Sequence, residues 1–219
     1  MTGLLRYQNA ALPVLNSRAS YIFDPACCHQ RIAKTIQVIS IEPIGGSDNY
    51  VHKSASCDIG SIALSAGMGS AFRFSVDDHD TATLMLSTGG SAQVRIGKST
   101  YISDPQSPAM YLAGERYSCQ IRQANGIELR LDRQKLAQRA LVMAEQLGRN
   151  SLDCCRLYQP WQVPSDNHLS MGLVAMLSRT LTYLDLTTLE LSGDTTARIE
   201  TLIYQQIAAM LYPELLSPA

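Results

Sequence analysis

Residues able to bind metal or to transfer protons are few in this chain and are scattered along it. No His-x-His pair occurs among the four histidines, which are His29, His52, His79 and His168. A metal-dependent barrel enzyme needs several His and Glu side chains presented by neighbouring strands. The chain also lacks the Gly-x-Ser-x-Gly turn that carries a nucleophilic serine. The sequence therefore predicts no catalytic residue, no metal site and no cofactor.

The densest polar cluster, residues 77–80 (Asp-Asp-His-Asp), has two interpretations. It could bind a divalent cation, or it could be a hydrated connection between two strands. We favour the connection, because carboxylates in an exposed turn keep their water at little cost.

Six cysteines offer a second kind of chemistry. Two adjacent pairs and two single residues make up the set, with no Cys-x-x-Cys: Cys27, Cys28, Cys154, Cys155, Cys57 and Cys119. In a reducing compartment we expect reduced and mostly buried thiols. The alternative is a redox or soft-metal sensor built on the adjacent pairs, although neighbouring cysteines rarely close a disulfide without strain.

Arginines and tyrosines within strand-like segments are the candidates for ligand binding. An inward-facing Arg73 could pair with a carboxylate, and tyrosines bring an aromatic face with a hydroxyl group. The sequence names Arg73, Tyr101, Tyr111 and Tyr117 for this role. Solubility of an outer sheet face and plain packing are the competing explanations for the same residues.

The elements that must position these residues are mainly strands over 49–132. In 72–76, Phe72, Phe74 and Val76 alternate with Arg73 and Ser75, which indicates a sheet with two chemically different faces. Turns are predicted at 88–90 (Thr-Gly-Gly) and, as the strongest hairpin signal, at 125–126 (Asn-Gly). This pattern predicts an antiparallel barrel or sandwich.

After Asp132 the apolar period changes from two to about 3.6. We predict helices over 133–147, 167–188 and 195–212, the first capped by Asp132 and ended by Gly148. The second helix carries a leucine stripe that includes Leu173, Leu177, Leu181 and Leu184. The stripe is wide enough to pack on the barrel, to pair with a second copy of the chain, or to do both.

Composition and length limit the remaining choices. We divide the chain into an N-terminal extension with short helices (1–48), a β-barrel domain (49–132) and a helical subdomain (133–219). Eighteen Lys and Arg against nineteen Asp and Glu leave a net charge of −1, which gives no general attraction to nucleic acid or anionic lipid. The N-terminus does not read as a signal peptide and no apolar stretch is long enough to span a bilayer. We expect a cytoplasmic protein without membrane contact.

Three segments together resemble a known family. They are DIGSIALSAG (58–67), the run from FRFSV to YSCQI (72–121) and GIELRLDRQKLAQRALVMAEQL (126–147). Their order is similar to the N-terminal regulatory domain of AraC/XylS-type transcription regulators. The resemblance implies an α+β fold, with a cupin-like antiparallel β-barrel or sandwich followed by a C-terminal helical subdomain for dimerisation and linkage.

The resemblance also implies a function. It suggests a domain that senses a small-molecule effector and forms a homodimer through its helices, with no enzyme activity. The two helix-turn-helix units of such regulators have no counterpart in this sequence, so we expect DNA contact only through a C-terminal domain outside it. The alternatives are a cupin-like small-molecule-binding protein or metal-dependent enzyme, and a protein-interaction module with a filled barrel.

Overall fold

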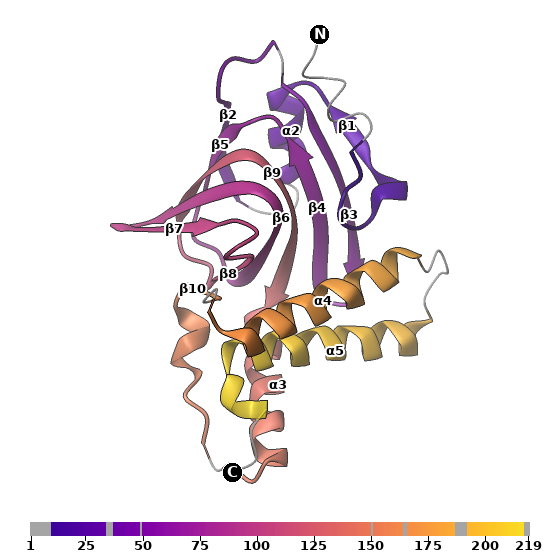
Figure 1. Cartoon of the computed structure of the whole chain (residues 1–219), viewed down its shortest axis with the longest axis vertical. Helices are drawn as coiled ribbons and strands as arrows, with labels where there is room; N and C mark the ends of the chain where they lie inside the picture. The colour runs from indigo at the N-terminus through magenta and orange to yellow at the C-terminus, as the bar shows by residue number, and fades with distance from the viewer. Residues whose placement is uncertain are drawn as a thin grey trace.

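A computed structural model describes residues 10–33, 37–48, 50–149, 151–163, 166–186 and 192–216. Figure 1 shows a curled sheet with three helices beneath it and a short helix at its N-terminal side. Positions 187–188 of the helix predicted over 167–188 lie outside the described residues.

The described sheet has ten strands. They are β1 (Ser20–Ile22), β2 (Val38–Pro43), β3 (His52–Ile59), β4 (Ile62–Gly69), β5 (Phe72–Val76), β6 (Thr81–Ile96), β7 (Ser99–Ser103), β8 (Ala109–Leu112), β9 (Tyr117–Asp132) and β10 (Trp161–Gln162). All of their pairings are antiparallel. The predicted antiparallel sheet is therefore confirmed.

The long strands β6 and β9 pair along their whole length and join two halves of the sheet. In one half the order is β1, β3, β4, β9, β6, β8, β10. In the other half β2 pairs with β5, β5 pairs with the start of β9, and the end of β6 pairs with β7. Because the same two strands run through both halves, a bend in them curls the sheet into a barrel-like shape (Figure 1).

β6 and β9 are kinked where the sequence predicted two turns. The turn at 88–90 and the hairpin at 125–126 are wrong predictions, since both strands continue through these positions and pair with each other there. Gly90 has a φ of 66° and Gln123 a φ of 52°. A Cβ on Gly90 would lie 2.2 Å from the Gln123 carbonyl oxygen, so this close crossing requires glycine.

The kink changes which side chains point into the barrel. Before it, Met85 and Ser87 of β6 line the interior; after it, Ala92 and Val94 are the buried interior residues. An uninterrupted strand would keep odd-numbered residues on one face throughout. One extra residue in each strand reverses the alternation, so the even-numbered apolar residues of β6 face the helices before the kink and the barrel interior after it.

The three C-terminal helices cover the outer face of the first half of the sheet, whereas the short N-terminal helix lies beside the barrel interior. The described helices are α2 (Pro25–Ile32), α3 (Arg133–Gln146), α4 (His168–Leu186) and α5 (Gly193–Leu211), with short 3-10 turns η1 (Asn16–Arg18), η2 (Cys154–Tyr158) and η3 (Pro213–Leu216). The Asp132 side chain accepts hydrogen bonds from the backbone N–H groups of Gln134 and Lys135, as its predicted capping role requires. Among the described helices, none combines the length and apolar character needed to cross a bilayer.

Two hydrophobic cores result from this arrangement. The larger core lies between the outer face of β4, β6 and β9 and the helices α3, α4 and α5. The smaller core lies inside the barrel and includes Phe72, Phe74, Val94 and Cys119. The predicted α+β class, with a barrel followed by helices, is confirmed. The sheet extends past the predicted 49–132 boundary at both ends, because β1 and β2 precede residue 49 and β10 follows residue 132.

Candidate ligand-binding site

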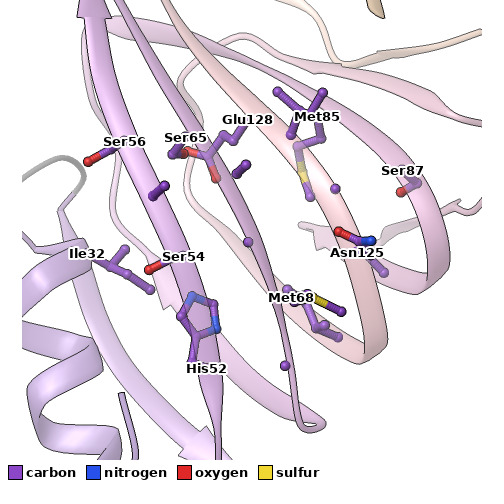
Figure 2. Close-up of a pocket in the computed structure, with 18 of the residues that line it drawn as sticks. Ile32, His52, Ser54, Ser56, Ser65, Met68, Met85, Ser87, Asn125 and Glu128 are labelled. Carbon is purple, nitrogen blue, oxygen red and sulfur yellow. The ribbon is translucent and has the colours of Figure 1, made fainter. Parts of the chain in front are cut away.

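A cavity of about 160 Å³ lies inside the barrel, next to the smaller core. Its walls come from the inner faces of β3, β4, β9, β6 and β5 and from the end of α2 (Figure 2). A buried apolar cavity of about 150 Å³ in another protein holds benzene, so a space of this size can hold a small molecule.

Strand register fixes the order of side chains on the cavity floor. Across β3, β4, β9 and β6, one row of paired residues reads Ser56, Ser65, Glu128 and Met85. The next row reads Ser54, Gly67, Gly126 and Ser87. These eight positions hold only one apolar side chain, that of Met85. The floor is therefore small and polar, and Glu128 carries its only formal charge (Figure 2).

Glycines keep the cavity open in two different ways. A Cβ on Gly69 would lie 2.5 Å from the carbonyl oxygen of Val51, and one on Gly126 would lie 2.7 Å from another carbonyl oxygen, so these positions require glycine for packing. A Cβ on Gly67 would lie 3.4 Å from the His52 ring and 3.9 Å from the Lys53 carbonyl oxygen, both ordinary contacts. Of these three lining glycines, Gly67 is therefore the one whose replacement could place a side chain in the cavity.

Another part of the cavity lining is apolar. Phe72 and Phe74 lie with ring centroids 5.8 Å apart, and Phe72 also meets His52 edge-on at 5.7 Å. Ile32 from α2 and Ile121 from β9 complete this part of the lining. A ligand in the cavity would therefore have an apolar side facing these rings and a polar side facing the serines and Glu128.

Glu128 is the one acidic side chain among the lining residues. Burial raises its pKa above the ordinary glutamate value, and the nearby Arg130 guanidinium partly opposes that rise. No hydrogen bond or ion pair within the described residues reaches its carboxylate. The group is partly exposed and faces the cavity, so a bound molecule could supply its missing partner.

His52 is neutral under physiological conditions. Burial, together with the positive charge of Arg31, lowers its pKa to about 4. Its Nδ1 is buried without a hydrogen-bond partner in the described structure. The His52 end of the cavity therefore offers a neutral ring and not a second charge.

Neither the protein-family models nor the curated proteins contain a match to this sequence. Solved structures do match by fold. The crystal structure of CuxR, an AraC-like transcriptional activator, aligns over 88% of this chain and 69% of CuxR, with a TM-score of 0.64 and 13% identity. The chain shares its fold with an AraC-like regulator.

Cupin structures match over smaller parts of the chain. A cupin superfamily protein from Desulfitobacterium hafniense aligns over 37% of this chain and 75% of its own, with 13% identity and a TM-score of 0.25. A cupin 2 conserved barrel domain protein from Rhodopseudomonas palustris covers 43% and 71%, with 11% identity and a TM-score of 0.26. The CuxR match extends beyond the barrel into the helices, as its coverage requires.

The four residues proposed from sequence for ligand binding lie outside this cavity's lining. Arg73 is exposed on the outer face of β5, opposite Glu42 of β2. Tyr101 packs at the edge of the smaller core, and buried Tyr117 meets Phe74 edge-on at 6.0 Å. The Tyr111 hydroxyl faces the helical side, where it donates a hydrogen bond of 3.0 Å to the Leu157 carbonyl oxygen. Their ligand-binding role stays a prediction, with no shared site among them.

The leucine stripe of α4 faces the chain's own core. Leu173, Leu177 and Leu181 are buried there, and Leu184 packs against it partly exposed. These side chains already have intramolecular partners in the larger core. Any pairing of two chains through α4 would need the other side of the helix.

The remaining sequence candidates have local structural explanations. All six cysteines are outside disulfides; two are buried, two are partly buried, and Cys27 and Cys155 are exposed. Residues 77–80 connect β5 and β6, and the Asp78 carboxylate accepts a hydrogen bond from the Arg116 backbone N–H. Within the described residues no group of three or more His, Cys, Asp or Glu is arranged to hold a metal ion.

Sequence reasoning missed Glu128, the central residue of the cavity. A signal was present, because 126–132 places Glu128 and Arg130 between three apolar residues in strict alternation. Such alternation predicts that one face of the strand is apolar and packed. It does not say whether the other face meets solvent or an interior space, and here it meets the cavity.

Proposed function

We propose that this chain is the regulatory domain of an AraC-type transcription regulator. Its barrel cavity would bind a small-molecule effector, and its helices would report that binding and pair two chains. DNA contact would come through a C-terminal domain outside this sequence, in the cytoplasm. The AraC-like fold shared with CuxR supports the class of protein, and the cavity supports effector binding over a filled barrel.

The observation that carries this proposal is the two-faced strand β9. Gly126 and Glu128 face the cavity, while Ile127, Leu129 and Leu131 belong to the core that packs on the helices. The same strand ends at Asp132, the N-cap of α3. Any movement of β9 on ligand binding would therefore shift the side chains that pack against the helices.

A polar network ties the helices to the sheet at this end. The Asp132 backbone N–H donates to the Tyr204 hydroxyl of α5 at 3.0 Å, and that hydroxyl also lies 3.0 Å from Ser61 Oγ in the β3–β4 turn. Glu200 accepts from the Ser61 backbone N–H at 3.1 Å and pairs with Lys135 of α3 at 2.9 Å. One cluster thus links β9, the β3–β4 turn, α3 and α5, which is what a signal route requires.

The exposed side of α4 is the proposed pairing surface. Leu169, Met176 and Tyr183 are 48%, 44% and 67% exposed and recur every seven residues along one face. A seven-residue apolar repeat is the spacing with which two helices pack side by side. The buried leucines of the same helix hold it to the sheet from behind.

The cavity's role can be tested with a filling substitution. Gly67→Leu places a side chain in the cavity without a backbone clash, whereas Thr100→Leu adds the same side chain on the exposed face of β7. A panel of small cellular metabolites is screened by thermal shift against wild type and both variants. We expect at least one compound to raise the melting temperature of wild type and of Thr100→Leu, but not of Gly67→Leu.

Hydrogen exchange on the same samples tests the signalling step. Binding should change the exchange of amides in α3 and α5, neither of which lines the cavity. A panel that stabilises none of the proteins, or stabilises Gly67→Leu as much as wild type, would contradict effector binding in the barrel. Binding without any change in the helices would contradict their role as reporters.

A further inference from the structure

The cavity presents hydrogen-bond acceptors whose partners are missing. The Glu128 carboxylate has no hydrogen bond or ion pair within the described residues, and the buried Asn125 Oδ1 also lacks a partner. Ionised carboxylate and amide oxygens only accept hydrogen bonds. Both groups line the same cavity, so a ligand that satisfies them must carry N–H or O–H donors (Figure 2).

The positive charges near the cavity do not replace such a donor. Arg130 lies two residues along β9 and acts on Glu128 through space, but it forms no ion pair with it, and it is also attracted by Asp58. Arg31 lines the cavity near His52, whose pKa it helps to lower. His52 is four residues from Ser56 on β3, about 13 Å at the rise of a strand, so Arg31 lies at the other end from the Glu128 row.

We propose that the cavity binds a small organic cation, a protonated amine or guanidine on a short apolar body. The cationic N–H groups would donate to Glu128, with the hydroxyl oxygens of Ser56 and Ser65 in the same row as further acceptors. The apolar body would lie against Met85 and Phe74. This inference rests on the proposed function, since it names the chemistry of the effector for the same cavity.

Other ligand classes fit these groups less well. An anion would bring a like charge against a partly buried carboxylate, which is unfavourable at low effective dielectric. A neutral alcohol can donate to the carboxylate, but it leaves the charge itself uncompensated. Charge-assisted hydrogen bonds are about twice as strong as neutral ones, so the cation gains most from this site.

Matched probes separate these classes. Benzylamine, benzyl alcohol and benzoate share one shape and carry a positive, zero or negative charge; butylamine, 1-butanol and butyrate repeat the comparison on a thinner body. Calorimetric titration of wild type should give at least about tenfold tighter binding of the amine than of the matching alcohol, and no binding of the carboxylate. Glu128→Gln should remove that preference while still binding the alcohol.

The pH dependence of amine affinity gives a second readout. The affinity should fall as the pH is lowered toward the ordinary range of glutamate pKa values, because Glu128, whose pKa is raised by burial, then takes up a proton. His52, with a pKa of about 4, stays neutral until the pH comes close to that range, and burial keeps Tyr117 and Cys119 protonated. Arg130 remains charged throughout. Glu128→Gln should show no such dependence.

The outcomes distinguish this inference from the function on which it rests. Equal affinity for amine and alcohol, or amine affinity unchanged in Glu128→Gln, overturns the cation assignment but leaves the cavity as a binding site. The same holds if no probe binds while the metabolite panel still gives a response that Gly67→Leu abolishes. Failure of the panel as well overturns effector binding itself.

Discussion

Replacing Glu128 by glutamine should stabilise the empty protein. The side chain is only partly exposed, burial raises the pKa of its carboxyl group, and no partner within the described residues compensates its charge. Glutamine keeps the shape and removes the charge. An unsatisfied buried polar group costs about 1–3 kcal/mol, and more when charged. Since the cavity admits some water and Arg130 lies nearby, we take the low end, about 1 kcal/mol.

The size of this stability gain depends on pH. Because the folded-state pKa of Glu128 lies above its unfolded value, the folded state binds protons more readily, and the wild type loses stability as the pH rises through the folded pKa. Glu128→Gln should therefore equal the wild type below the unfolded pKa, about 4.3, and exceed it at neutral pH. For a chain of this size, about 1 kcal/mol corresponds to a melting temperature higher by about 2–4 °C.

Thermal unfolding at neutral and acidic pH, in the absence of amines, measures this difference. Glu42→Gln is the control, because Glu42 is exposed on β2 opposite Arg73, where removing a surface charge changes stability by less than about 1 kcal/mol. A melting temperature of Glu128→Gln below that of the wild type at neutral pH would refute the reasoning. It would mean that Arg130 already compensates the carboxylate, and that no cationic ligand is needed to do so.

Two further predictions concern the helices. Leu177→Asp should unfold the protein, because Leu177 is fully buried; the cost should exceed about 4 kcal/mol, and circular dichroism should detect the unfolding. Met176 is exposed, so Met176→Asp should stay folded. Light scattering should show that this variant is a monomer where the wild type is a dimer. A wild type that is monomeric at high micromolar concentration contradicts the pairing. Tyr204→Phe removes the hydroxyl that contacts Asp132 and Ser61 and should lower stability toward urea by about 1 kcal/mol; an unchanged unfolding midpoint would show that this contact does not matter.

The sequence predicts the fold class because that class depends on local periods. Alternation in 72–76 and the 3.6-residue period after Asp132 each follow from which side of one element is packed. Gly89-Gly90 predicts a turn because a turn and a kink both favour glycine at a positive φ, which Gly90 adopts. Asn125-Gly126 also predicts a turn, but Gly126 is required there because a Cβ would lie 2.7 Å from the Leu86 carbonyl oxygen. A kink differs from a turn only in that the two segments, at 89–90 and 125–126, lie on strands that pair with each other. That pairing joins residues more than thirty positions apart in the sequence.

The candidate site was less predictable than the fold, for a related reason. Ser56, Ser65 and Glu128 come from three strands, and nothing in the local sequence indicates that they share a row. Arg73 and Tyr111 looked suitable by residue type, but the inner face of each strand is set by register and by the kink. Small residues such as Gly67 leave space for the cavity because they have no side chain to fill it. A search for reactive side chains does not detect such residues.

The free-energy cost of the unpaired Glu128 carboxylate in the empty protein also determines which conformation a ligand would stabilise. A ligand shifts a conformational equilibrium only by the difference in its affinity for the two states. A cation held by Glu128 would stabilise whichever arrangement of β9 keeps that carboxylate enclosed, and the empty protein would favour arrangements that let water reach it. Because Leu129 and Leu131 on the opposite face of β9 pack on the helices, the enclosed and hydrated arrangements cannot present the same surface to α3 and α5. The unpaired carboxylate is therefore the source of the free energy that the proposed switch would use.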